Sequence, residues 1–205
     1  MAIIAFLRSM KRGVKKTTRT LGAIRIIGGQ WRGRKLPVLD AEGLRPTTDR
    51  NKETLFNWLM PYVHARRGLD VFAGSGGLGF EALSRHAQSM TFIELDRAAT
   101  KLLEQNALSL KIPSEQVKIM QGDSLHLLAQ LPGEYELIFL DPPFHQGLLP
   151  KVIKLLDDKS LLAPNGLIYI ESEAQGASYQ VPQDWHCIKE KATKQLCFRL
   201  YQKQQ

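Results

Sequence analysis

Long apolar runs are absent from this sequence of 205 residues. None approaches the roughly 18 consecutive apolar residues that a membrane-spanning helix needs. Cysteine is scarce too, since Cys187 and Cys197 are the only two, and two thiols are too few for a disulfide scaffold or a zinc site. We interpret both as reduced thiols of a protein in a reducing compartment, the cytoplasm. The five histidines are scattered along the chain, and we expect no metal.

Acidic residues are missing from the beginning of the chain, where the first is Asp40. Residues 1–67 contain 15 Lys or Arg and four Asp or Glu, a net charge of +11, whereas the remaining residues contain 13 and 16, a net charge of −3. The whole excess behind the formal net charge of +8 therefore lies in the first third. Such a concentrated positive segment favours a polyanionic partner, most often nucleic acid, and a solubilising tail is the alternative.

The chain divides into three parts in this interpretation. Residues 1–22 are expected to be a flexible basic arm or an extension from an upstream start codon. A secretory signal places its charges before its apolar stretch, whereas here the charges come after a short apolar stretch. A transit peptide stays open for this segment, which lacks acids. Residues 23–66 are expected to form a nucleic-acid-binding appendage, a hairpin followed by a helix, and residues 67–205 the main domain.

The appendage has the pattern of a β-hairpin followed by a helix. In residues 24–38, isoleucines precede Gly28-Gly29, a dipeptide that accepts the positive φ of a tight turn. Pro37 is expected to end the return strand. A helix is predicted to begin near Thr48 or Asp49, since either side chain can cap free backbone amides.

From residue 67 onward, short apolar strands alternate with amphipathic helices. This alternation predicts an α/β, Rossmann-like fold with a mostly parallel seven-stranded sheet and helices on both faces. The last two strands are expected to form a closing pair. The predicted strands are 69–72, 90–94, 117–120, 137–140, 167–170, 186–190 and 196–201, and the predicted helices are 78–85, 97–110, 124–131 and 148–156.

A glycine-rich segment follows the first of these strands. Residues 70–79 read Asp-Val-Phe-Ala-Gly-Ser-Gly-Gly-Leu-Gly and contain the pattern G-x-G-x-x-G between a strand and a helix. Glycines there allow a tight turn and the close approach of a ligand to the backbone. We call residues 71–76 the glycine loop. Glu94 ends the next strand, where an acid can accept hydrogen bonds from both hydroxyls of a ribose, or can simply be solvated.

These features suit either a nicotinamide cofactor or S-adenosylmethionine (SAM). Asp70, directly before the glycine loop, would crowd a pyrophosphate with negative charge, whereas it would favour the ammonium group of a methionine. Asp123 follows the third strand and could accept a hydrogen bond from an adenine amine, or cap the following helix, or do both.

The sequence Asp141-Pro142-Pro143-Phe144 follows the strand predicted at 137–140, and we call it the proline corner. Two prolines remove two backbone donors and stiffen the turn, which leaves mainly acceptors pointing outward. The Asp141 carboxylate and the Pro142 carbonyl form an acceptor pair suited to an exocyclic amine. Phe144 offers a flat face on which a base can stack.

A strand followed by Asp-Pro-Pro-Phe, downstream of a glycine loop, resembles the class I SAM-dependent methyltransferases that modify exocyclic amines of bases. Across residues 24–173 the chain is similar to the bacterial 16S rRNA guanine-N2 methyltransferases of the RsmD type. His86 stands where that family usually has glycine. The motifs that carry the resemblance are residues 25–34, residues 45–50 with Glu53, Leu55 and Phe56, and residues 70–76, 81–85 and 141–144.

The resemblance implies SAM-dependent methylation of the N2 amine of a guanine in 16S rRNA, with S-adenosyl-L-homocysteine as the other product. It implies action on small-subunit rRNA, free or within the subunit or an assembly intermediate. Nothing in the sequence demands more than a monomer. The catalytic residues implied are Asp141, Pro142 and Phe144. The cofactor residues implied are Asp70, Phe72, Gly74, Gly76, Glu94 and Asp123. The RNA-binding residues implied are Arg25, Arg32, Arg34, Lys35, Arg45 and Arg50.

Three other functions stay open. A DNA adenine-N6 methyltransferase uses a similar acidic Pro-Pro-aromatic turn, but usually carries a sizeable target-recognition domain for which this chain has little room. A nicotinamide-dependent oxidoreductase would leave the proline corner unexplained. A non-catalytic RNA-binding module would not need the glycine loop together with Glu94 and Asp123.

Overall fold

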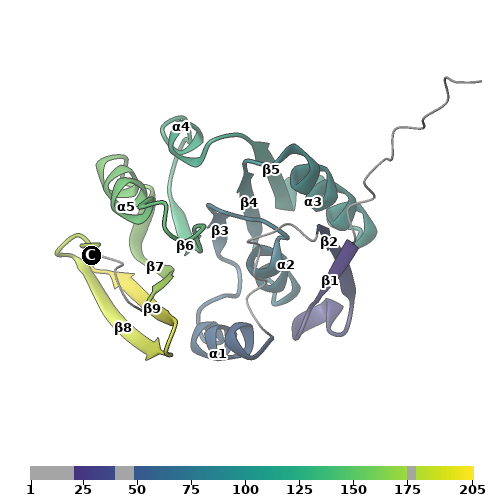
Figure 1. Cartoon of the computed structure of the whole chain (residues 1–205), viewed down its shortest axis with the longest axis horizontal. Helices are drawn as coiled ribbons and strands as arrows, with labels where there is room; N and C mark the ends of the chain where they lie inside the picture. Colours follow the sequence, from purple (N-terminus) through teal and green to yellow (C-terminus); the bar gives the residue numbers. More distant parts are fainter. Residues whose placement is uncertain (1–20, 40–48, 175–178) are drawn as a thin grey trace, which may run out of the picture.

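The computed structural model describes residues 21–39, 49–174 and 179–205. A seven-stranded sheet with the order β5-β4-β3-β6-β7-β9-β8 forms its centre, and a separate two-stranded sheet packs beside it (Figure 1). The predicted α/β fold, with its mostly parallel sheet, is therefore confirmed. Within the described residues, no helix is long and apolar enough to cross a membrane.

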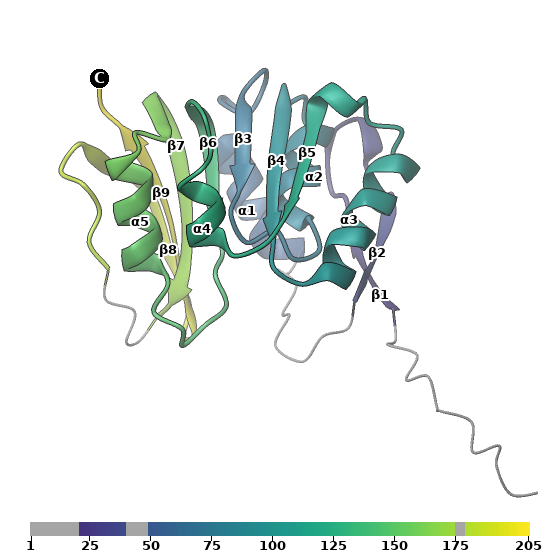
Figure 2. The ribbon, with the colours of Figure 1, turned by 90° about the horizontal axis from the view of Figure 1, so that it is seen from above.

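Five neighbouring strands of the large sheet pair in parallel. β9 runs opposite to them, and β8, which pairs antiparallel with β9, again runs in their direction. The parallel strands are β3 (Arg67–Asp70), β4 (Ser89–Glu94), β5 (Val117–Gln121), β6 (Tyr135–Leu140) and β7 (Leu162–Glu173). The closing pair, β8 (Trp185–Ala192) and β9 (Leu196–Lys203), joins the sheet through β7. Figure 2 shows the strands fanning out in this order.

Helices cover both faces of the sheet (Figure 2). One buried cluster joins one sheet face to α1 (Asp49–Leu59), α2 (Gly77–Ser84) and α3 (Arg97–Ser109). A second cluster joins the other face to α4 (Ser124–Leu128) and α5 (Leu149–Asp158). Residues alternate between the two clusters along the central strands, so that Phe139 belongs to the first and Leu140 to the second. Near the end of β6, Phe139 therefore faces α1 and α2, whereas Leu140 faces α4 and α5.

The predicted hairpin exists, but its turn differs from the prediction. β1 (Leu21–Arg25) pairs antiparallel with β2 (Lys35–Leu39) across a loop that contains a short 3₁₀ helix, Gly29–Trp31. The prediction of a tight turn at Gly28-Gly29 was wrong. Gly28 has extended φ and ψ, and of the two glycines only Gly29 has a positive φ, 73°. Pro37 lies inside β2 opposite Ala23 rather than at its end; a two-stranded sheet has open edges, where a missing N–H is tolerated.

Two elements, α4 and β7, differ from the sequence prediction by three or more residues at an end. α4 ends at Leu128 instead of residue 131, because the amides of Gln130 and Leu131 bond to carbonyls three residues back, which tightens the chain ahead of Pro132. β7 begins at Leu162, five residues before the predicted strand. The sequence Pro164-Asn165-Gly166 is typical of a turn, but here it lies within β7, at a register shift between β6 and β7.

The division of the chain at residues 22 and 66 stays a prediction. In the described part, Ile24, Ile26 and Leu36 of the hairpin belong to the same buried cluster as the face of the large sheet. The hairpin and α1 are therefore continuous with the core of residues 67–205 in packing terms. Residues 1–20 and 40–48, which include the predicted arm and Arg45, lie outside the described residues.

Candidate functional site

The residues predicted for reaction and cofactor follow neighbouring strands. β3 ends at Asp70, β4 at Glu94 and β6 at Leu140, and β3 lies between the other two. Because these strands are parallel, their carboxyl ends meet at one edge of the sheet. The chain also reverses its progress across the sheet between β3 and β6, and ligands bind at such switch points in open α/β sheets.

The glycine loop turns sharply into α2. Gly74 and Gly76 both have positive φ, 50° and 77°, and Gly76 is the N-cap of α2. A Cβ at Gly76 would lie 2.5 Å from the Phe80 ring and 2.6 Å from Leu103. Gly76 is therefore required by both conformation and space. Phe72 is half-buried in the same loop.

Asp70 is buried at the end of β3, with 2% of its surface exposed. One carboxylate oxygen accepts a hydrogen bond from the Gly79 N–H at 3.2 Å. Burial raises the pKa of Asp70 to about 8; the charges of Asp141 and Glu94 add to the rise, and the Gly79 amide opposes it. The carboxyl is therefore mostly protonated at neutral pH, and a nearby cation would favour its ionised form.

Glu94 ties the glycine loop to the end of β4. Its Oε2 accepts the Gly74 N–H at 2.7 Å, and its Oε1 accepts the Asp96 N–H at 2.7 Å. The sequence left open whether this side chain is a solvated strand end. It is half-buried and bound to two backbone amides, so it holds the shape of the loop whatever else it binds.

Asp123 is exposed and caps α4, since its side chain accepts the His126 N–H at 2.9 Å. The predicted capping role is therefore confirmed. Its Oδ2 is not used by this cap, so the second predicted role, at an adenine amine, stays compatible with the geometry.

The proline corner begins one residue after β6. Asp141 and Phe144 are half-buried, Pro142 is buried and Pro143 is exposed. The next residue, His145, has a positive φ of 62°, and its N–H donates to Glu173 Oε1 at the end of β7, at 2.6 Å. This bond fastens the corner to the neighbouring strand, so the corner is held at both ends.

Comparisons with known proteins agree with this geometry. The family model described as "Conserved hypothetical protein 95" matches residues 24–202. "Ribosomal RNA small subunit methyltransferase D" of Haemophilus influenzae is 51% identical over 91% of this chain and 97% of its own length. The Escherichia coli K12 protein of that name is 50% identical over 89% and 91%. The chain belongs to this methyltransferase family.

A solved structure of the Escherichia coli protein yhhF superposes on this chain with a TM-score of 0.82, at 50% sequence identity. The match covers 89% of this chain and 99% of that one. This chain therefore shares its fold with that structure over most of its length.

The hairpin of this family member is docked on α2 by a buried polar network. The Ile27 N–H donates to Glu81 Oε2 at 2.8 Å, and the Ser84 hydroxyl donates to the Gly28 carbonyl at 2.6 Å while accepting the Trp31 N–H at 3.0 Å. A Cβ on Gly29 would collide with the Ser84 carbonyl. The motif at residues 81–85 therefore fixes the hairpin.

A cation completes this network. Arg85 Nε donates to the fully buried Glu81 carboxylate at 2.8 Å. The Arg85 guanidinium also lies over the Phe56 ring of α1, with its carbon 5.0 Å from the ring centre. The buried Glu81 charge is thus paired, and α1, α2 and the hairpin are held together by one ion pair.

The predicted RNA-binding residues gather mainly on the hairpin. Arg25 and Lys35 are opposite one another in the strand register, and both are exposed, as is Arg32 in the intervening loop. Arg34 is exposed as well, but its Nη2 donates to the Ser109 carbonyl of α3 at 2.9 Å. Arg50 is exposed in the first turn of α1. Arg45 lies outside the described residues.

The hairpin lies close to the glycine loop. A Cβ on Gly77, the first residue of α2, would be 3.6 Å from Ile24 Cδ1 of β1, and the buried Lys52 of α1 donates its Nζ–H to the Arg25 carbonyl at 2.6 Å. The basic surface and the carboxyl edge of the sheet are therefore built from adjacent elements.

Sequence reasoning missed two glutamates of β7. Glu173 holds the proline corner through His145, and Glu171 is 4% exposed beside it. The available signal was an acidic pair, Glu171-Ser-Glu173, directly after the apolar strand predicted at 167–170. Because β7 is parallel to β6, that pair had to lie next to the proline corner.

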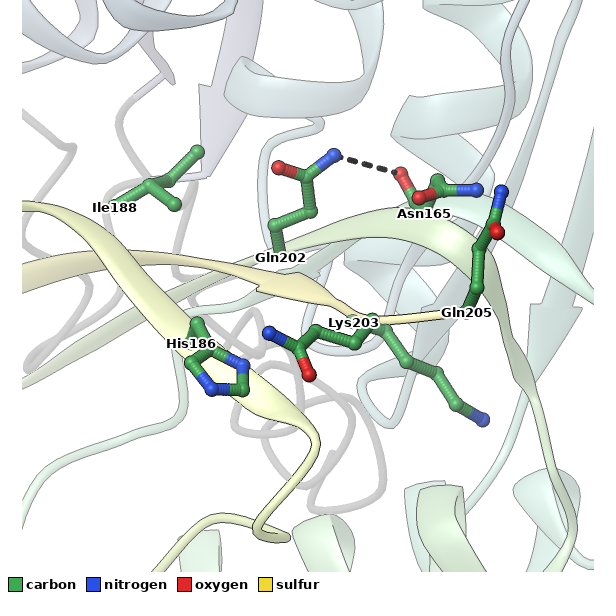
Figure 3. Close-up of a pocket in the computed structure, with 7 residues that line it drawn as sticks. Asn165, His186, Ile188, Gln202, Lys203 and Gln205 are labelled. Carbon is green, nitrogen blue, oxygen red and sulfur yellow. Dashed lines mark hydrogen bonds between the residues drawn. The ribbon is translucent and has the colours of Figure 1, made fainter.

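An open depression lies away from these residues. It has a volume of about 410 Å³ and is lined by Asn165, His186, Ile188 and Gln202–Gln205 (Figure 3). Asn165 belongs to the first part of β7, so the depression is near the edge opposite the carboxyl ends of the parallel strands. It contains none of the predicted site residues. No cluster of three or more His, Cys, Asp or Glu side chains suited to a metal ion occurs in residues 21–39, 49–174 and 179–205.

Proposed function

We propose that this protein transfers a methyl group from SAM to the exocyclic N2 amine of a guanine in small-subunit ribosomal RNA. The observation that carries the proposal is the position of the proline corner: it follows β6, the immediate neighbour of β3 and its glycine loop. The relatives named as small-subunit rRNA methyltransferases support the substrate class.

The residues around the glycine loop fit SAM, which supplies an electrophilic methyl group and leaves as S-adenosyl-L-homocysteine. Gly74 and Gly76 carry no side chains at two positions of the turn, and Phe72 adds an apolar surface. Glu94 keeps lone pairs for ribose hydroxyls after accepting two amides. A methionine ammonium near Asp70 would offset the burial that now raises the pKa of its carboxyl. Asp123 would accept from the adenine amine.

The proline corner would hold the target amine. Asp141 and the Pro142 carbonyl accept its two hydrogens, and Phe144 stacks on the base. Two acceptors draw the nitrogen lone pair out of conjugation with the ring, which makes a poor nucleophile better. The half-buried positions of Asp141 and Phe144 agree with groups that a base could reach.

One proton must leave the amine when it is methylated. The nitrogen becomes strongly acidic as it gains positive charge, so the proton passes to the Asp141 carboxylate or to water, and no separate tuned base is needed. The target base has to be unstacked to reach the corner, in a loop or as a flipped nucleotide.

RNA would bind across the hairpin and α1. Arg25, Arg32 and Lys35 supply exposed positive charge there, with Arg34 and Arg50 beside them and Arg45 in the segment that follows β2. Basic side chains at phosphates position a nucleic acid without reading its sequence. We propose that the protein acts as a monomer in the cytoplasm, without a metal, on rRNA or an assembling small subunit.

The alternatives are less well supported. A nicotinamide-dependent oxidoreductase gains no support from relatives that are named methyltransferases. A DNA adenine-N6 methyltransferase would share the proline corner, but the relatives at about half identity are named for ribosomal RNA.

The test is methyl transfer from labelled SAM to three acceptors: deproteinised 16S rRNA, assembled small subunits and DNA. The RNA should come from a strain that lacks this activity, so that the target is unmodified. We expect label in the RNA or the subunits, recovered as N2-methylguanosine after digestion. Label in DNA adenine, or binding of NAD in place of SAM in equilibrium dialysis, would overturn the proposal.

A further inference from the structure

Glu171 lies beside the catalytic corner on the neighbouring strand. β6 and β7 pair in parallel register, with Phe139 opposite Tyr169 and Leu140 opposite Ile170. The next residues are Asp141, which directly follows β6, and Glu171 of β7, and the Asp141 charge acts on Glu171. Because side chains alternate between faces, both belong on the face of Phe139 and Tyr169, about 5 Å apart from strand to strand.

The surroundings of Glu171 are apolar and closely packed. Its side chain is 4% exposed, and its Oε2 accepts the hydroxyl hydrogen of Tyr169 at 3.1 Å. The Tyr169 ring stacks on Phe198 with an interplanar angle of 10° and meets the edge of Phe139. Tyr169 is itself 1% exposed, so this hydrogen bond fixes the Glu171 carboxyl at the corner.

Burial and the Asp141 charge, in that order, raise the pKa of Glu171 to about 8, and the Tyr169 hydrogen bond opposes the rise. The Asp141 charge also raises the pKa of Tyr169 and of Asp70. Glu171 is also the more buried of the two carboxyls, since Asp141 is only half-buried, so the proton of the pair is expected on Glu171.

Other ionisable groups packed on this face have their own partners. Lys191 of β8 lies near Tyr169 but donates to the Thr54 hydroxyl of α1 at 3.1 Å. Lys52 of α1 donates to the Arg25 carbonyl. The charge of Cys197 of β9 adds slightly to the burial that raises the pKa of Tyr169. Burial also raises the pKa of the Cys197 thiol itself.

We propose that Glu171 is a positioning residue, which carries the proton of a carboxyl pair and so leaves Asp141 ionised and fixed for the target amine. This inference rests on the proposed function. In the reaction, the bond from the methyl carbon to the amine nitrogen forms as the bond to sulfur breaks, and the amine proton leaves to Asp141 or water. Glu171 keeps its own proton throughout.

The role makes Glu171 sensitive to alkaline pH. Once Glu171 ionises, two carboxylates face each other in a buried corner, where they repel and draw in water. Asp141 then moves away from its position at the amine. A group with a pKa of about 8 is mostly protonated at pH 7 and mostly ionised at pH 9, so we expect wild-type kcat to fall about tenfold between these values.

The kinetic test compares the ratio of kcat at pH 9 to kcat at pH 7 in three proteins with the same rRNA. Glu171→Gln cannot ionise but still accepts from Tyr169, and we expect its ratio to be several times higher than that of wild type. Glu104→Gln, an exposed position on α3, should follow wild type. Titration of the RNA affects all three proteins equally and so cancels in the comparison. Equal ratios of kcat for Glu171→Gln and wild type would overturn the inference.

A second measurement does not depend on activity. Carbon-13 NMR of the carboxyl groups should show Glu171 titrating near pH 8, and Asp141→Asn should lower that pKa because it removes the neighbouring charge. An ordinary pKa for Glu171, or one that Asp141→Asn leaves unchanged, would refute the carboxyl pair. If wild type transfers no methyl group at any pH, the proposed function fails instead, and the NMR result still decides whether the pair exists.

Discussion

At the residue scale, His86 adopts a backbone conformation that favours glycine. His86 follows α2 with a φ of 68°, and its N–H donates to the Leu83 carbonyl. This is the left-handed conformation that ends many helices and that glycine adopts most readily. Histidine at this position is exposed and strained.

We therefore expect His86→Gly to stabilise the protein by about 1 kcal/mol, because glycine relieves the left-handed strain. Urea denaturation measures the change in the free energy of unfolding. Gln88→Gly, at an exposed residue nearby without positive φ, is the control and should destabilise slightly. A loss of stability in His86→Gly would show that its side-chain contact with the His64 ring outweighs the strain.

The raised pKa of Asp70 predicts that the free energy of unfolding depends on pH. Its pKa is raised to about 8 in the folded chain, from an ordinary value near 4. The folded state therefore binds the proton more tightly, so this contribution is fully present below pH 4 and is lost as pH rises to about 8. In Asp70→Asn, the free energy of unfolding should fall less steeply between pH 5 and 8 than in wild type. Equal slopes by urea titration would contradict the burial of an acid at this position.

At the scale of elements, the contact between hairpin and α2 depends on Gly29. Its φ is 73°, and a Cβ would collide with the Ser84 carbonyl. Gly33, in the same loop, has a φ of 86° and nothing within 4 Å of its Cβ position. Substitution of either glycine therefore strains the backbone, but only a side chain at Gly29 would also collide with another residue.

We expect Gly29→Ala to lower the free energy of unfolding by about 3 kcal/mol, and Gly33→Ala by about 1 kcal/mol. Amide exchange should also speed up at Ile27, whose N–H donates to Glu81, in the first variant only. Equal losses in the two variants would show that the hairpin accommodates the extra methyl group.

The order and type of these elements were predictable because each strand and helix has its own local pattern. Periodicity placed the α/β alternation, and the corner motif placed Asp141 at the sheet edge. Interactions between distant segments were not predictable in this way. Gly28-Gly29 read as a tight turn because nothing local shows that Ser84 fills the space above it, and Glu171 became visible only when β7 was paired with β6.

At the scale of the whole molecule, the basic hairpin and α5 lie toward opposite ends of the large sheet (Figure 1). The described basic residues of the hairpin lie next to the glycine loop, whereas α5 lies toward the opposite end of the sheet (Figure 1). If RNA crosses the hairpin, binding should depend on salt through that surface.

Arg32→Ala with Lys35→Ala should weaken RNA binding and reduce the slope of log affinity against log salt by about 2, one for each lost phosphate contact. Lys151→Ala with Lys159→Ala removes the same charge from exposed positions in α5 and directly after it and should leave the slope nearly unchanged. Filter binding at several salt concentrations measures both. An unchanged slope in the hairpin variant would remove the hairpin from the RNA interface.

The central claim is that the Asp141 carboxylate orients the target amine beside the methyl donor. The most direct measurement is single-turnover methyl transfer by Asp141→Ala at saturating SAM, together with SAM binding by equilibrium dialysis. We expect transfer to fall about 100- to 1,000-fold while SAM is still bound. Transfer at the wild-type rate by this variant would contradict the account.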